Sequence, residues 1–166
     1  MKLADKYGLF VIEDCAQSFL AKDHGRLSGT IGHMASFSFE TKKHMTTGQG
    51  GIVITDDEIL AIKIRKHAGL GYRTLTAKQG MTNLMPIQFQ NPHFKRIDTL
   101  AYNYRLPEIC AALGLAQLER LDEKVEKRRS IAQMYDSIIS KVDWMEPQEI
   151  PENCTSSYWT YAVIYN

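Results

Sequence analysis

The sequence predicts an α/β fold with a helical part appended to it. Three observations support this prediction: short apolar or β-branched runs alternate with glycine-rich turns up to residue 55, one capped helix follows, and two long helical patterns come after residue 106. Strands that precede helices in this order are typical of α/β architecture. With 166 residues, 44% of them hydrophobic, the chain is long enough for one ordinary domain with a hydrophobic core.

The first strand is expected at Leu9–Ile12. The residues before it are typical of the last turns of a helix, which Gly8 ends. A continuous apolar run after such a stop is typical of a strand buried on both faces in a parallel sheet. Glu13 and Asp14 follow this run, and ligands of open α/β sheets bind at the carboxyl ends of strands. One of these two acids is therefore a candidate site residue.

The chemistry is expected in the stretch 36–51. Ser36–Phe39 alternates small polar with large apolar residues and predicts a strand. Thr46–Gly51 supplies glycines where the backbone turns tightly or approaches a ligand closely. Lys42 and Lys43 lie between these two segments. An amine held at a defined place is a condition for covalent chemistry with a carbonyl, so each lysine is a candidate nucleophile.

The other elements of the first hundred residues are a strand, a helix and two loops. Ile52–Thr55 predicts a short strand, and a capping-box spacing predicts a helix that begins at about Asp56. The glycine-spaced residues 25–32 predict an ordered loop. A long loop with scattered glycines and prolines, Gly80 among them, is expected at 69–99, and loops of this length are usually functional or partly disordered.

Two helices are expected after Leu106. The first begins at Pro107, and its residues Ile109–Leu118 are apolar on most sides, which predicts a place in the interior or at a subunit interface. An amphipathic stripe on the second predicts ordinary core for Ile131, Met134, Tyr135, Ile138, Ile139 and Val142. Its basic cluster predicts a solvated face and consists of Lys124, Lys127, Arg128 and Arg129. A linker is expected at 146–152, before a terminal strand at 158–166 with nothing after it to pair.

Composition argues against several classes of protein. Twenty basic and nineteen acidic residues give a net charge of +1, so no global field recruits nucleic acid or an anionic membrane. The three cysteines and five histidines lack the close spacing of metal ligands, so we expect neither a metal site nor a disulfide. No run is long and apolar enough to span a bilayer, and the start lacks the zones of a signal peptide, so we expect a cytoplasmic protein.

Three blocks of the sequence resemble, in the same order, one enzyme family. The blocks are Val11–Gln17, Phe37–Phe39 with Lys43–Gly51, and Tyr102–Leu106 through Ala116–Leu118. They are similar to the DegT/DnrJ/EryC1/StrS sugar aminotransferases. This resemblance implies a fold-type-I pyridoxal 5'-phosphate (PLP) enzyme with a mixed, mostly parallel sheet. Residues 1–120 would form the C-terminal portion of its cofactor-binding large domain, and residues 121–166 a connecting helix and the start of a truncated small domain.

The resemblance also implies the roles of five residues. Lys43 falls where the family places its Schiff-base lysine. Asp14 matches the acid that pairs with the pyridinium nitrogen, and Gln17 the residue beside the ring hydroxyl of the cofactor. Ser38 matches a phosphate contact, and Asn103 an asparagine that reaches the phosphate from the partner subunit. The implied reaction is amination of a nucleotide-linked keto-sugar or a keto-cyclitol by an amino-acid donor, in a homodimer with a shared site.

Several features depart from the family pattern. Gln49 stands where an acidic residue is usual, and His33 where an aspartate is common. The N-terminal part of the family, which carries the ring that stacks on the cofactor, has no counterpart here, so we expect a fragment that binds cofactor weakly by itself. Two alternatives stay open. One is a sugar 3-dehydratase, whose members carry histidine at the lysine position, whereas His44 comes one residue later; the other is a non-catalytic remnant that only dimerises.

Overall fold

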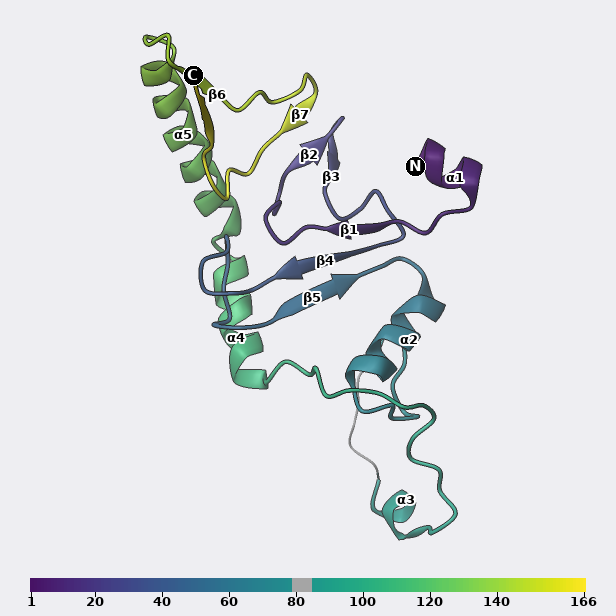
Figure 1. The fold of residues 1–166 in the computed structure, drawn as a ribbon. Coiled ribbons are helices and arrows are strands. Elements are labelled where there is room, and N and C mark those ends of the chain that lie inside the picture. Colours follow the sequence, from purple (N-terminus) through teal and green to yellow (C-terminus); the bar gives the residue numbers. More distant parts are fainter. Residues whose placement is uncertain (79–84) are drawn as a thin grey trace. The chain divides into compact units, whose positions relative to one another are not determined.

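The computed structural model describes residues 1–78 and 85–166 (Figure 1). The chain divides into two compact units, one of residues 1–54 and 107–166 and one of residues 55–106. The expected large-domain and small-domain boundary between residues 120 and 121 stays a prediction. Gly80, which the sequence places in the long loop, lies outside the described residues.

A three-stranded mixed sheet forms the centre of the first unit. Its strand order is β1 (Ile12–Asp14), β4 (Met34–Ser38) and β5 (Gly51–Ile54), with β1 parallel to β4 and β4 antiparallel to β5. The strands around residues 36–39 and 52–55 were predicted, and their pairing gives the mixed sheet that the resemblance implies. The prediction of a strand at Leu9–Ile12 buried on both faces is wrong, because the strand begins at Ile12, which is 58% exposed. β1 is an edge strand of the described sheet.

A smaller sheet replaces part of the expected loop. β2 (Lys22–Asp23) and β3 (Arg26–Leu27) form a hairpin, and β7 (Cys154–Thr155) pairs with β2 from the other end of the chain. The two residues between β2 and β3, His24 and Gly25, have φ values of 48° and 77°. Positive φ at both central positions is the geometry of a tight hairpin turn. These strands were not predicted, because two residues are too few to show the alternation of apolar and polar side chains that marks a strand.

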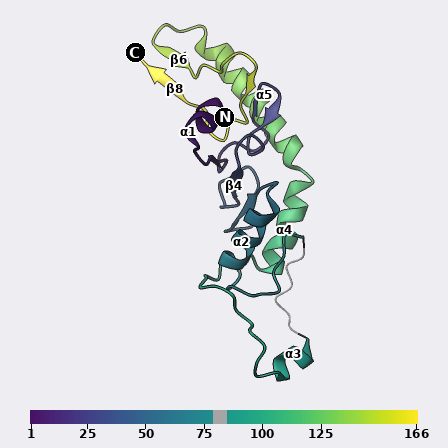
Figure 2. The same ribbon diagram turned by 90° about the vertical axis from the view of Figure 1, so that its right-hand side faces the viewer.

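The first part of α5 (Leu121–Ile139) packs on the turn after β1 and on the loop after β4. The hydrophobic cluster there comprises Phe19, Phe39, Met45, Leu121 and Val125, with Leu20 and Phe37 packed against it. α5 continues from α4 (Glu108–Leu118) after a short break, as Figure 2 shows. α4 comes close to the turn after β4 at Gly114, where an added Cβ would lie 3.0 Å from the Thr47 methyl group.

The predicted stripe of α5 is largely wrong as core. Met134 is 64% and Ile138 58% exposed, while Ile139 is buried. The buried residues of this helix are Leu121, Val125, Ala132 and Ile139, of which only Ile139 belongs to the predicted stripe. The apolar residues of α4 are also mostly exposed in this chain, Ile109 at 81%. Periodicity identified both helices, but it did not identify the face that this chain covers.

The C-terminal residues form a third, two-stranded sheet. β6 (Met145–Pro147) pairs antiparallel with β8 (Val163–Tyr165). The terminal strand is therefore shorter than predicted and has a partner, and the predicted linker begins inside β6. At the other terminus, α1 (Lys2–Tyr7) ends at Gly8 in the left-handed conformation, as predicted.

The second unit contains α2 (Glu58–Ala68) and the short α3 (Pro86–Gln90). The side chain of Asp57 caps α2 by accepting from the backbone N–H groups of Ile59 and Leu60, so this helix begins one or two residues later than predicted. Asp98 links α2 to the segment after it by accepting from Lys66 at 2.7 Å and from Arg73 at 3.0 Å. Over both units, no helix among residues 1–78 and 85–166 has the length and apolar character to cross a membrane.

Candidate active site

Two predicted site residues lie at the same edge of the sheet. β1 and β4 run parallel with Asp14 opposite Ser36, so Asp14 and Ser38 both stand at the carboxyl ends of their strands. The Asp14 side chain is exposed, and its Oδ1 accepts only a local hydrogen bond of 3.1 Å from the Ala16 N–H among the described residues. The half-buried Ser38 Oγ accepts from the Glu40 N–H at 3.3 Å. Ligands of open α/β sheets bind at this edge.

The neighbouring acid, Glu13, serves the fold. Its carboxylate accepts from three backbone N–H groups of the loop before β4, those of Gly29, Ile31 and Gly32, at 2.6–2.7 Å. Burial favours the neutral form of this acid, but the three donors and the nearby positive charge of Arg26 outweigh burial and hold its pKa below the usual range. Of the two acids at the end of this strand, Glu13 is engaged by the fold, whereas Asp14 is exposed and accepts a local hydrogen bond.

The loop that carries Lys43 is pinned by its own hydrogen bonds. The Phe39 carbonyl accepts from the hydroxyl of Thr46 and from the N–H of Thr47, both at 3.0 Å. The Thr46 hydroxyl oxygen accepts in turn from the Gly48 N–H at 2.8 Å. Gly48 has a φ of 83°, a conformation that glycine adopts without steric cost. We therefore expect the position of the Lys43 backbone to be well defined.

The structure distinguishes the two candidate lysines. Lys42 is exposed, and its carbonyl accepts from the indole Nε1–H of Trp159 at 2.9 Å. Lys43 is half-buried, and its Nζ lies 4.5 Å from the centroid of the Trp159 ring. A lysine ammonium at this distance from an indole makes a cation–π contact. Trp159 therefore holds both the backbone before Lys43 and its amine.

A segment from the far end of the chain, Ser156–Trp159, joins the lysine loop to the predicted Gln17 region. The Nε2–H of His44 donates to the Ser157 carbonyl at 3.0 Å, and the Ser157 hydroxyl lies 3.5 Å from the Gln17 carbonyl. The side chain of Gln17 itself is exposed. Three stretches distant in sequence thus meet here: the turn after β1, the loop after β4 and Ser156–Trp159.

Two arginines of α5 fix Ser156–Trp159 in place. Arg128 donates to the Trp159 carbonyl at 3.0 Å, and Arg129 donates to the carbonyls of Ser156 and Leu20, both at 3.0 Å. The prediction of a solvated basic face is therefore wrong for these two residues. Nothing in the sequence spacing of Arg128, Arg129 or Trp159 linked them to the lysine loop.

His44 is buried directly after the catalytic candidate. Burial lowers its pKa, and the charges of Arg128 and Lys43 act in the same direction, whereas the hydrogen bond to the Ser157 carbonyl opposes them. Its Nδ1 has no hydrogen-bond partner among the described residues. The imidazole therefore binds within the fold through its Nε2–H, which donates to the Ser157 carbonyl.

Asn103 belongs to the second unit. It pairs with Gly69 in an isolated bridge, and its side-chain oxygen accepts from Arg105 Nε at 2.8 Å. The side chain is exposed. Its predicted role as a phosphate contact from a partner subunit stays a prediction.

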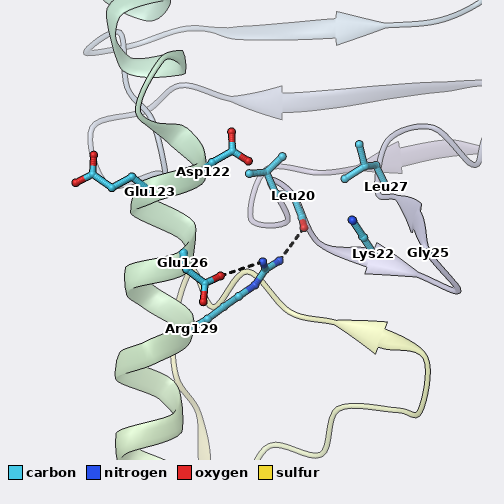
Figure 3. A pocket seen from close by; sticks show the side chains of 8 residues that line it. All are labelled: Leu20, Lys22, Gly25, Leu27, Asp122, Glu123, Glu126 and Arg129. Carbon is cyan, nitrogen blue, oxygen red and sulfur yellow. Dashed lines mark hydrogen bonds and ion pairs between the residues drawn. The ribbon is translucent and has the colours of Figure 1, made fainter.

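A cavity of about 700 Å³ lies between the β2–β3 hairpin and α5 (Figure 3). Its lining consists of Leu20, Lys22, Gly25, Leu27, Asp122, Glu123, Glu126 and Arg129. None of the predicted site residues is among them. Arg129 contributes to its wall while bound to Glu126 and to the Leu20 carbonyl, as the dashed lines in Figure 3 indicate. The volume of this cavity is therefore no guide to the lysine chemistry.

The fold and the site together define an α/β protein whose half-buried lysine follows a central strand and stands in one unit with a carboxylate and a hydroxyl at the sheet edge. The model of the DegT/DnrJ/EryC1/StrS aminotransferase family matches residues 1–166, and the chain belongs to this family. The resemblance that the three sequence blocks indicated is confirmed.

Named relatives agree with this membership. A GDP-perosamine synthase of Escherichia coli O157:H7 is 34% identical over 164 residues, which are 99% of this chain and 40% of that protein. The crystal structure of the aminotransferase TlmJ from Streptoalloteichus hindustanus matches 99% of this chain and 41% of that one, with a TM-score of 0.83 and 30% identity. An E. coli GDP-4-keto-6-deoxy-D-mannose-3-dehydratase with bound hydrated PLP matches 99% of this chain and 42% of that one, with a TM-score of 0.80 and 28% identity. The chain spans about 40% of the length of the curated relatives that it matches.

Proposed function

We propose that this chain is the lysine-bearing part of a PLP-dependent aminotransferase that aminates a keto group on a nucleotide-linked sugar. The observation that carries the proposal is the pinned, half-buried Lys43 in the loop after β4, in one unit with Asp14 and Ser38 at the carboxyl edge of the sheet. The name of the E. coli O157:H7 relative, a GDP-perosamine synthase, supports the sugar-nucleotide substrate class. A keto-cyclitol is the second substrate class that the family resemblance offers.

The donor set of the described residues fits the cofactor. The amine of Lys43 suits the aldehyde of the cofactor, and the carboxylate of Asp14 suits its pyridinium nitrogen. The hydroxyl of Ser38 suits its phosphate. The bound cofactor supplies an electron sink. Asp14 would hold a proton at the ring nitrogen, Gln17 would contact the ring hydroxyl, and the Lys43 amine would attach the aldehyde and later carry a proton at its Nζ.

The proposal extends to the assembly and the amino donor. An amino acid would supply the amino group, and a second copy of the chain would contribute Asn103 to the phosphate. Exposed apolar residues on α4, including Ile109 and Leu115, offer a surface that a second copy could cover. A helix with apolar residues on most sides is normally buried, so the exposed residues of α4 support a contact with a second copy.

The environment of His44 favours the aminotransferase over the dehydratase. In the dehydratases that resemble this family, histidine replaces the lysine. Here His44 is 3% exposed and donates its Nε2–H to the Ser157 carbonyl, whereas the amine of Lys43 points to the ring of Trp159. His44 is committed to the fold, and the residue with reactive chemistry is Lys43.

The test locates the covalent attachment. The chain is incubated with a limiting amount of PLP, reduced with borohydride and mapped by mass spectrometry, as wild type, K43A and the neighbouring control K42A. We expect a single major adduct at Lys43 in wild type and K42A, and none at this position in K43A. An adduct spread evenly over the surface lysines in all three proteins would refute the assignment and favour a non-catalytic remnant.

A further inference from the structure

A second group of reactive side chains gathers at the hairpin between β2 and β3. Asp23, His24 and Cys154 each offer one ligand atom, and these atoms all lie within 4.8 Å of one another. Sequence spacing gave no sign of the group, because Cys154 is 131 residues from Asp23. None of the three belongs to the predicted lysine site.

The backbone places these side chains together. Asp23 and Cys154 are directly opposed partners in the antiparallel pairing of β2 with β7. His24 follows Asp23, and successive residues of a regular strand point to opposite faces. At His24 the strand ends in a turn with a φ of 48°, and the imidazole Nδ1 comes within 2.7 Å of Asp23 Oδ1. The His24 N–H also donates to the carbonyl of Asn153 at 2.9 Å, which fixes the turn against the residue before Cys154.

A single oxygen of the Asp23 carboxylate, Oδ1, contacts both His24 and Cys154. Asp23 Oδ1 lies 2.7 Å from His24 Nδ1 and accepts from Cys154 Sγ at 3.4 Å. Burial and the negative charge of Asp23 raise the pKa of the Cys154 thiol, while the contact with His24 is the main cause that lowers the pKa of Asp23. The Asp23 carboxylate oxygen is therefore in contact with both other donor atoms, and all three lie within 4.8 Å of one another.

We propose that Asp23, His24 and Cys154 form a binding site for a divalent metal ion of the zinc class. One carboxylate oxygen, one imidazole nitrogen and one thiolate sulfur are ligands that Zn²⁺ accepts, whereas Mg²⁺ and Ca²⁺ prefer oxygen alone. The carboxylate and the thiolate together carry two negative charges, which match the charge of the ion. Three protein ligands leave a fourth position to water, and the side chains of His24 and Asp23 are 71% and 57% exposed, so water reaches the site.

A metal ion at this position would stabilise the fold. It would join the β2–β3 hairpin to β7, and with it a residue near the start of the chain to one near its end. Arg26, whose charge also acts on Asp23, is the basic residue that opposes the ion. A ligand that binds the folded chain and not the unfolded one stabilises the fold by mass action, so the metal should raise the unfolding temperature in a concentration-dependent way.

Cobalt(II) tests the site, because a cobalt–thiolate bond gives a charge-transfer band in the near ultraviolet. The reduced chain, without added PLP, is titrated with Co²⁺ and then with Zn²⁺ as competitor. We expect a saturable band at one equivalent that Zn²⁺ displaces, and a rise in the unfolding temperature with either ion. C154S should remove the band, and H24N should weaken Zn²⁺ binding by more than about 100-fold, since even an outer partner of a metal ligand contributes 10- to 100-fold.

Matched controls separate this site from other thiols and from misfolding. C110S removes a half-buried free cysteine elsewhere in the chain and should leave band and affinity unchanged. H24N also tests the site if C154S unfolds, because asparagine tolerates the left-handed turn conformation. The absence of a saturable band, its persistence in C154S or an unchanged affinity in folded H24N would overturn the proposal.

Discussion

The lysine loop, residues 39–51, and the segment Ser156–Trp159 meet at the site but are held by different kinds of contact. The loop is held by hydrogen bonds among its own residues, such as those from Thr46 and Thr47 to the Phe39 carbonyl. Ser156–Trp159 has no regular secondary structure and is held by side chains from α5 and by contacts with the loop. Local contacts can be deduced from a short stretch of sequence, whereas the distant ones require the fold.

Among the variants that test these contacts, R129A is expected to lower the free energy of unfolding most. Arg129 donates to the Ser156 and Leu20 carbonyls, and its loss leaves both without this donor. A hydrogen bond to a charged group contributes about 1.5–3 kcal/mol, so we expect the free energy of unfolding to fall by about 3 kcal/mol. Urea unfolding measures the change. The control K127A removes an exposed charge of the same helix and should stay within about 0.5 kcal/mol of wild type; an equal loss in both variants would contradict the assigned role.

The next effect concerns Trp159, the residue through which Ser156–Trp159 contacts the lysine. W159L removes the indole donor to the Lys42 carbonyl and the ring beside the Lys43 amine. One hydrogen bond and one cation–π contact contribute about 1 kcal/mol each, so we expect about 2 kcal/mol less stability.

W159L should also make the Lys43 amine react faster than in wild type in competitive labelling with an acylating reagent. W144L is the matched control, because Trp144 is exposed and packs on Tyr165. Labelling of Lys43 that is the same in W159L and wild type would mean that Trp159 does not hold the amine.

The division between local and distant contacts also explains what the sequence could predict. The strand at Ser36–Phe39, the glycine turn and the Gly8 helix stop were found because their signals lie within a few residues. The strand pattern alone left Glu13 and Asp14 as equal candidates, and only the family resemblance favoured Asp14, because only the fold brings the N–H groups of residues 29–32 to Glu13. The predicted core stripe of α5 failed for a related reason, since periodicity marks an apolar face but not whether this chain covers it.

A smaller effect is expected inside the lysine loop itself. T46V keeps the shape of Thr46 but removes the hydroxyl that donates to Phe39 and accepts from Gly48. We expect a loss of about 1–2 kcal/mol, since each neutral hydrogen bond contributes about 0.5–1.5 kcal/mol. T46S retains the hydroxyl and should recover most of this stability. In hydrogen exchange, T46V should speed the exchange of the Gly48 N–H and leave Ser156–Trp159 unchanged; faster exchange in both segments would show that the two are not held independently.

The last effect is a pH dependence that originates at His44, where the loop and Ser156–Trp159 touch. Burial lowers the pKa of His44 below its ordinary value of 6.5, so at low pH the unfolded chain binds a proton that the folded chain resists. Stability from this residue is present above pH 6.5 and is lost as the pH falls below this value, by at most about 1.4 kcal/mol per pH unit. Urea unfolding between pH 7 and pH 5 should give a steeper loss for wild type than for H44Q, because glutamine carries no titrating proton. H93Q, which changes an exposed histidine, should follow wild type, and an H44Q slope equal to that of wild type would place the pH dependence elsewhere.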